Sequence, residues 1–285
     1  MDALEYAEKF IDNGYVAIEA VVSDSSIAEL KAIASVAANS TEINICGDGL
    51  LVSIPEIVLP IVGNSLILDI LERLIGPFVQ LDGFTLVTLP SGSNVDIEWH
   101  RDIYGAIPRG REFQIPLAVN MLIYLQDLND EVGCLRVIPG SHRMPIIMTD
   151  DERRLPSNKE ALIRVKAGTA ILLHNNLVHS RSKNNSKSDR GHVSVVYSLS
   201  CMKSSIDFSH PAIREMIFLL RRIGSRRLCR LLGEDELQRD RYNSGFLIEE
   251  ERSWGGWIAE DKQVEANQGD SPGGCVKADS SNIIG

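Results

Sequence analysis

Short apolar runs separated by turn residues fill the middle of the chain. Turn signals such as Pro90-Ser-Gly92, Pro139-Gly140 and Ala167-Gly168 divide the runs. No helix long enough to cross over is indicated between them, so the sheet is expected to be mostly antiparallel. The pattern predicts a mainly β fold with flanking helices, a double-stranded β-helix of the jelly-roll, cupin-like type. The expected strands are Gly83–Leu89, Val95–Asp102, Ile115–Leu125, Cys134–Ile138, Leu162–Val165, Thr169–His174 and Arg190–Ser200.

Helical spacing is found on both sides of this strand region. After a strand-like segment, Tyr15–Ile18, a helix is expected from Ser26, which forms a capping-box pattern with Glu29. A second helix is expected over Ser65–Leu74 and a third around Ala212–Leu232. In the second helix, the residues expected inward are Leu66, Ile70 and Leu74, and those expected largely outward are Asp69, Glu72 and Arg73.

These elements predict one domain over residues 1–262. Its expected parts are N-terminal helices in 1–80, the jelly-roll core in 81–200 and a C-terminal helical segment in 201–262. Residues 263–285 contain few large apolar side chains and are expected to be a disordered tail.

Composition limits the classes of partner. The 285 residues are 44% hydrophobic and 24% charged, as in a soluble globular protein, and the net charge of -10 argues against a nucleic-acid surface. Five scattered cysteines predict neither disulfides nor a zinc site, which favours the cytoplasm. The apolar stretch Leu50–Leu68 contains Pro55, Glu56 and Pro60, so we expect a buried loop and helix there and no membrane span.

Candidate metal ligands lie at two distant places. In an extended strand, His100 and Asp102 point to the same face while Arg101 faces away. An H-x-D triplet alone is weak evidence, because strand histidines are more often hydrogen-bonded structural residues. A third ligand, His179, follows a later strand. Two imidazoles and one carboxylate on one side of a metal are the arrangement of non-heme Fe(II) oxygenases.

Further motifs share the order and spacing of a known family. They are the entry segment Phe10–Ile18, His100-x-Asp102, the run Gly133-Cys-Leu-Arg-Val-Ile-Pro-Gly-Ser-His142, His179, and Arg190 eleven residues later. Over residues 8 to 200 the chain resembles the phytanoyl-CoA dioxygenase (PhyH-like) family of Fe(II)/2-oxoglutarate oxygenases. Two positions depart from the pattern: Val132 stands where relatives commonly have Asn, and Arg181 where they often have a small hydroxyl residue.

The resemblance implies cofactors and roles. His100, Asp102 and His179 would bind Fe(II), with 2-oxoglutarate and O2 as cosubstrates. Arg190 would hold the distal carboxylate of 2-oxoglutarate, a role that suits its always-charged, bidentate donors. The alternative for Arg190 is a surface salt bridge, for example with Asp189. Thr88, Asn120 and Ser194 are further cosubstrate candidates, each of which is also compatible with a plain sheet residue.

The other notable side chains have structural interpretations. We expect Trp99 to pack on the face opposite His100, His210 to begin a helix, and His142, His174 and His192 to be hydrogen-bonded sheet or loop residues. The arginine-rich helix around Ala212–Leu232 is expected to be solvated or paired within the chain. An arrangement of strand, long loop and return strand predicts a hairpin that sets Arg190 across from His179.

The expected function is hydroxylation of an unactivated C–H bond in a small molecule. Desaturation, ring closure, oxidative dealkylation and a non-catalytic binding module remain alternatives. Asp102 disfavours halogenation, because it occupies the position that chloride needs. A polar or anionic substrate is suggested by Tyr104, Arg109, Arg111, Phe113 and, at the pocket mouth, Arg181.

Overall fold

Two antiparallel sheets pack against each other. The computed structural model describes residues 1–37, 44–47, 49–92, 97–102, 116–144, 146, 148–234, 259 and 263. The larger sheet has the strand order β1-β8-β5-β10-β3-β2 and the smaller one β4-β9-β6-β7, with every pairing antiparallel. This confirms the predicted double-stranded β-helix. The strands are β1 Tyr15–Ile18, β2 Asn44–Cys46, β3 Val79–Leu89, β4 Ile97–His100, β5 Ala118–Tyr124, β6 Leu135–Val137, β7 Ala161–Ile163, β8 Ala170–His174, β9 His179–Arg181 and β10 Arg190–Leu199.

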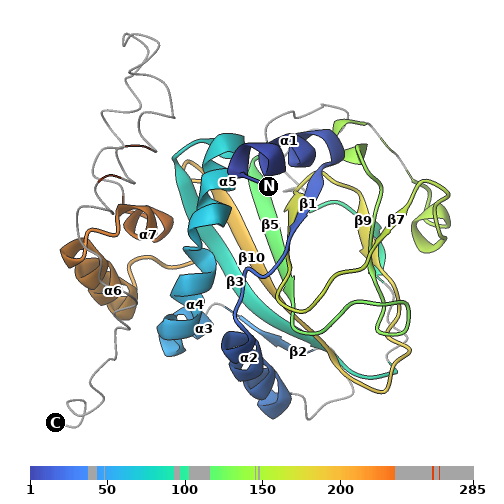
Figure 1. The fold of residues 1–285 in the computed structure, drawn as a ribbon, viewed down its shortest axis with the longest axis horizontal. Helices are drawn as coiled ribbons and strands as arrows, with labels where there is room; N and C mark the ends of the chain where they lie inside the picture. Colours follow the sequence, from blue (N-terminus) through green and yellow to red (C-terminus); the bar gives the residue numbers. More distant parts are fainter. Residues whose placement is uncertain are drawn as a thin grey trace.

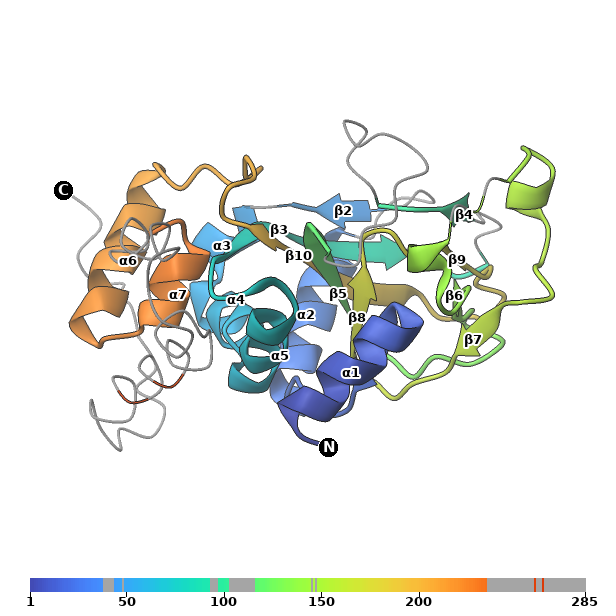
Figure 2. The same ribbon diagram turned by 90° about the horizontal axis from the view of Figure 1, so that it is seen from above.

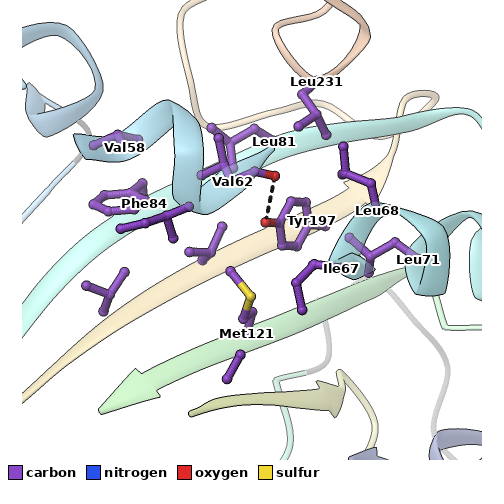
Figure 3. Close-up of a cluster of buried hydrophobic side chains, with 14 of the residues drawn as sticks. Val58, Val62, Ile67, Leu68, Leu71, Leu81, Phe84, Met121, Tyr197 and Leu231 are labelled. Atoms are coloured by element: carbon purple, nitrogen blue, oxygen red, sulfur yellow. Dashed lines mark hydrogen bonds between the residues drawn. The ribbon is translucent and has the colours of Figure 1, made fainter. Parts of the chain in front are cut away.

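Helices cover the outer face of the larger sheet, as Figure 1 shows for α4 and α5 beside β3, β10 and β5. Alternate strand residues such as Phe84, Met121 and Val195 pack there in the main hydrophobic core. The hydroxyl of Tyr197 donates to the Val62 carbonyl at 3.0 Å within this core (Figure 3). The helices are α1 Ala3–Asn13, α2 Asp24–Ala37, α3 Gly49–Ser53, α4 Pro55–Val62, α5 Ser65–Ile75, α6 Pro211–Arg222 and α7 Arg226–Leu231, with the 3-10 turns η1 Ser141–Arg143 and η2 Glu152–Arg154.

The inner face of the larger sheet packs on the smaller sheet. Tyr124, Ile171 and Leu173 form a second core with Leu135 and Val137 of β6. Residues that alternate with the outer-face set therefore face the space between the two sheets. On β10 this inner set includes Arg190 and Ser194, which lie opposite Leu89 and Thr85 of β3.

Several expected boundaries need correction. In the segment 1–80, the expected strand Tyr15–Ile18 is β1, which pairs with β8, but β2, which pairs with β3, was not expected. This segment also contains α1, which the sequence reading missed although Asp2 and Glu5 form its capping box. The third expected helix is two helices, α6 and α7. Every helix in the described part of the chain is too short or too polar to span a bilayer.

The predicted hairpin is not formed. In the larger sheet β5 lies between β8 and β10, so β10 does not return beside the strand that precedes His179. His179 itself begins β9, which belongs to the smaller sheet. Arg190 and His179 therefore lie in different sheets.

Buried charges connect the C-terminal helices to the domain. Glu72 on α5 is 3% exposed and accepts from Arg227 of α7 at 3.0 Å, and Arg227 also contacts Asp69 at 2.9 Å. Glu72 was expected to point outward, but α7 covers that side of α5. Glu234 pairs with Arg214 and Arg221 of α6, and Arg230 of α7 lies near Glu72. Together with Arg227, four arginines of these two helices are therefore paired within the chain. Figure 2 shows α6 and α7 at the end of the molecule opposite β6, β7 and β9.

Candidate metal centre

Three side chains from two chain segments converge at the edge of the smaller sheet. His100, the last residue of β4, lies opposite His179, the first residue of β9. Asp102 follows just past the end of β4. One ligand atom from each of these residues lies within 4.8 Å of the others. Asp102 Oδ1 is 3.5 Å from His100 Nε2, and Asp102 Oδ2 is 3.5 Å from His179 Nε2.

Backbone carbonyls fix the orientation of both imidazoles. His100 Nδ1 lies 2.8 Å from the Glu98 carbonyl, and His179 Nδ1 lies 3.0 Å from the Leu177 carbonyl. A carbonyl only accepts, so each Nδ1 carries the hydrogen and each neutral ring has its lone pair on Nε2. These lone pairs face the Asp102 carboxylate. The donor set of two Nε2 atoms and one carboxylate fits an Fe(II) ion held on one side.

The surroundings favour the metal-binding form of His179. Burial lowers the pKa of His179, the nearby His100 lowers it further, and the Asp102 carboxylate opposes both effects. A neutral imidazole is the form that binds a metal. The side chain of His179 is 9% exposed, whereas those of His100 and Asp102 are 35% and 32% exposed. The three groups are therefore accessible to a ligand from the side of His100 and Asp102.

Asn120 contacts the carboxylate directly. From β5 of the larger sheet, its Nδ2 donates to Asp102 Oδ2 at 2.5 Å. The predicted inward orientation of Asn120 is thus observed, with a metal-ligand candidate as its partner.

Arg190 is held in a cradle of carbonyls. It is 1% exposed, and its Nη1 donates to the carbonyls of Val132, Gly133 and Ser182 at 3.2, 2.9 and 3.0 Å. Its Nη2 is buried without a hydrogen-bond partner among the described residues. One nitrogen therefore fixes the guanidinium while another retains donors for an anion. The surface salt bridge considered for Arg190 does not fit a side chain so deeply buried.

Gly133 makes this cradle possible. It has φ +88°, and a Cβ there would lie 2.3 Å from the Lys183 carbonyl oxygen and 2.6 Å from Arg190 Nη1. Only glycine combines this conformation with so close an approach.

Comparison with known proteins identifies this region. Residues 67–192 match the family model for phytanoyl-CoA dioxygenase (PhyH). This stretch of the chain is therefore similar to that family. Among curated proteins, Dioxygenase hkm4 of Aspergillus hancockii is 31% identical over 131 residues, which are 44% of this chain and 41% of the relative. The match thus spans about two fifths of that relative's length.

Solved structures share the fold of this chain. The epimerase SnoN, in complex with Fe3+, alpha ketoglutarate and nogalamycin RO, has a TM-score of 0.54 at 21% identity, over 70% of this chain and 84% of SnoN. HygX from Streptomyces hygroscopicus, with nickel, 2-oxoglutarate and hygromycin B, has a TM-score of 0.57 at 15% identity, over 70% and 88%. EctD from S. alaskensis has a TM-score of 0.57 at 21% identity, over 72% and 79%.

A second cation lies between the two sheets. Arg181, two residues after His179 on β9, is 7% exposed, so it does not flank a pocket mouth as expected. The ring centroid of Tyr124 is 5.4 Å from that of His192. Burial lowers the pKa of His192 to about 3, and Arg181 and Arg190 contribute. Burial raises the pKa of Tyr124, which the same two arginines oppose. A neutral imidazole and a neutral phenol therefore line this positive region, and the sequence reading missed Tyr124.

The remaining cosubstrate candidates differ in placement. Ser194 faces the interior like Arg190, about 13 Å further along β10. Thr88 is buried opposite Gly191, and therefore lies on the outer face, away from Arg190. The structure thus brings Asn120 to the triad, sets Arg190 and Ser194 on the inner face, and separates Thr88 from them.

The structural interpretations of the other side chains agree with their contacts. Trp99 packs on Ile138 and Val178, opposite His100. His210 Nδ1 accepts from the Ala212 amide at the start of α6, and His142 Nε2 lies 2.9 Å from the Ile11 carbonyl. His174 Nδ1 accepts from the Asn176 amide. The predicted pocket residues Tyr104, Arg109, Arg111 and Phe113, and most of 235–285, lie outside the described residues.

Proposed function

We propose that the protein is an Fe(II)/2-oxoglutarate-dependent dioxygenase that oxidises a C–H bond of a small molecule. The observation that carries the proposal is the convergence of His100, Asp102 and His179 within 4.8 Å, beside a buried arginine with an unpartnered nitrogen. Hydroxylation is the expected outcome: the substrate gains one oxygen atom of O2, and 2-oxoglutarate becomes succinate and CO2 with the other.

Each residue of the site would have its own role in the reaction. His100, Asp102 and His179 would hold Fe(II) from one side and leave positions for cosubstrates. Iron and 2-oxoglutarate together supply the oxidising power toward C–H bonds when both are bound. Arg190 would orient 2-oxoglutarate by donating Nη2 to its distal carboxylate, and a guanidinium fits that role because it is planar and always charged. Asn120 would hold Asp102 in one orientation through the 2.5 Å hydrogen bond.

The apolar core between the two sheets suggests how water is kept from the reaction. Side chains of both sheets, including Tyr124, Leu135 and Val137, pack together there, and Val137 pairs with His179. Exclusion of water protects reactive species and strengthens charge interactions. The positive region around Arg181 and Arg190 favours anionic groups, which supports 2-oxoglutarate as the cosubstrate and a polar or anionic substrate.

Two fold relatives support the proposed substrate class. SnoN and HygX were solved with nogalamycin RO and hygromycin B, which supports a specialised small molecule as substrate here. Ring closure is a second candidate outcome, because SnoK, with a TM-score of 0.53 at 20% identity, is named a carbocyclase. Product mass separates the two: hydroxylation adds an oxygen atom, and ring closure or desaturation removes two hydrogens. The cytoplasm is the proposed compartment.

The decisive test is succinate formation by the purified protein. Apo-protein would be loaded anaerobically with Fe(II) and 2-oxoglutarate, then exposed to O2, and succinate would be quantified with and without candidate substrates. We expect wild-type protein to form succinate and Asp102→Ala to lose this activity, because it lacks the carboxylate ligand. Equal succinate from both proteins would contradict the proposal. Ligand binding without succinate would support the binding-module alternative.

A further inference from the structure

Arg101, the residue between two metal-ligand candidates, has contacts of its own. Its Nη1 donates to the backbone carbonyl and the side-chain Oδ1 of Asn176 at 2.7 and 2.8 Å, and its Nη2 donates to the Met144 carbonyl at 2.7 Å. Three acceptors from two loops thus meet one guanidinium. These acceptors lie on the side of β4 away from the metal site, as the sequence predicts, and Arg101 is half-buried with hydrogen bonds from both Nη atoms.

Asn176 connects Arg101 to the segment that precedes His179. It lies three residues before His179, is 6% exposed, and its Nδ2 donates to the His142 carbonyl at 2.8 Å. The same η1 turn supports the segment again, because Ser141 Oγ accepts from the Val178 amide at 2.8 Å. The stretch that leads into His179 is therefore hydrogen-bonded to Arg101 on one side and to η1 on the other.

Asp102 needs such support from outside the sheet. The β4–β9 pairing ends at His100 opposite His179, so Asp102 lies beyond the last paired position. Continued pairing would set residues 101 and 102 opposite 178 and 177, and the structure has no ladder there. The Arg101 guanidinium spans this region instead, by bonding the carbonyl of Asn176.

We propose that Arg101 is a positioning residue that sets the distance between Asp102 and His179 and thereby determines metal affinity. This rests on the proposed function, since it assumes that the triad binds a metal. Groups that orient metal ligands typically change affinity by about 10- to 100-fold when removed. Lysine cannot replace Arg101, because one ammonium does not match acceptors spread across a planar fork.

The test measures binding of Mn²⁺ or Fe(II) alone to metal-free protein. We expect Arg101→Ala and Arg101→Lys to raise the metal Kd about tenfold or more. The matched control is Arg143→Ala. Arg143, in the η1 turn, donates one hydrogen bond to the Asp12 carbonyl and is exposed, so its loss should leave the Kd unchanged.

A spectroscopic readout and a second variant keep the proposal falsifiable if Arg101→Ala folds poorly. Bound Co²⁺ has visible absorption bands that report ligand geometry, and we expect them to change in Arg101→Lys but not in Arg143→Ala. Asn176→Ala should raise the Kd too, and adding Arg101→Ala to it should cost less than in wild-type protein. A Kd within twofold of wild type, with an unchanged Co²⁺ spectrum, overturns this proposal alone. A wild-type protein that binds no metal overturns the proposed function with it.

Discussion

Asn120 and Asp102 form a 2.5 Å hydrogen bond between the two sheets. Asn120 lies on β5 of the larger sheet, whereas Asp102 follows β4 of the smaller one. The amide donates to Oδ2, the oxygen that faces His179 at 3.5 Å. The larger sheet therefore contributes to the orientation of a carboxylate that the smaller sheet supplies.

Asn120→Ala is expected to weaken metal binding. Without the donor, the carboxylate rotates more freely, and the Kd for Fe(II) or Mn²⁺ should rise about tenfold. Asn120 is only half-buried, so the melting temperature of the metal-free protein should change little. Calorimetric titration with Mn²⁺ measures the first effect and a thermal melt the second. An unchanged Kd would show that Asp102 is oriented by other contacts.

Arg190→Lys is expected to raise the KM for 2-oxoglutarate. The ammonium loses the bidentate geometry and part of the carbonyl cradle, a cost of about 1.5–3 kcal/mol, or roughly 10- to 150-fold. Direct titration of 2-oxoglutarate into the Mn²⁺ form checks this without turnover. Arg164→Lys is the matched control, because Arg164 pairs with Asp130 at a half-exposed site. A normal KM in Arg190→Lys would be incompatible with the assigned role.

Gly133→Ala is expected to damage both stability and cosubstrate binding. The positive φ costs about 1–3 kcal/mol for alanine, and the added Cβ would meet the Lys183 carbonyl and Arg190 Nη1. Gly92→Ala is the control: its φ is +66°, but a Cβ there meets nothing within 4 Å. Urea denaturation should therefore show a larger loss for Gly133→Ala than for Gly92→Ala, and only the former should raise the KM for 2-oxoglutarate. Equal losses of stability in the two variants would show that close packing around Gly133 does not require glycine.

His192 is expected to reduce stability as the pH falls. Its pKa is about 3 in the folded protein and about 6.5 in an unfolded chain. Between these values the unfolded chain binds more protons, so the free energy of unfolding decreases on acidification, by at most about 1.4 kcal/mol per pH unit. Because His192 is partly exposed, we expect solvent screening to make the measured slope smaller than this upper limit. His192→Gln should flatten it, as measured by denaturant melts from pH ~7 to ~5. Identical slopes in both proteins would mean that His192 does not contribute.

Much of the site was predictable from spacing. Few other residue types can bind a metal or an anion as the H-x-D triplet, His179 and Arg190 can. Their order and spacing along the chain can be recognised without knowing how the strands pair. The alternating apolar runs similarly predicted the antiparallel fold. In both cases the signal is local, or depends only on residue type and separation.

The errors came from features that the sequence does not encode locally. Thr88 was a cosubstrate candidate because relatives of the resembled family often have a polar residue there, but the pairing of Leu89 with Arg190 turns Thr88 to the outer face. The hairpin failed because β5, distant in sequence, lies between β8 and β10. Glu72 was assigned outward from helical periodicity, which does not reveal that α7 covers it with Arg227. In each case the sequence did not reveal which distant segment packs against the residue or strand in question.

The contact between Glu72 and Arg227 limits how far the chain can be shortened. A fragment that stops after β10 would lose α7, which carries both arginines beside Glu72 and contributes Cys229 and Leu231 to the main hydrophobic core. Glu72 and the apolar side chains next to it would then be exposed to solvent. The smallest unit worth expressing for crystallisation or assay therefore includes α7. We therefore expect the two sheets without α7 to form a less stable protein than the chain that includes it.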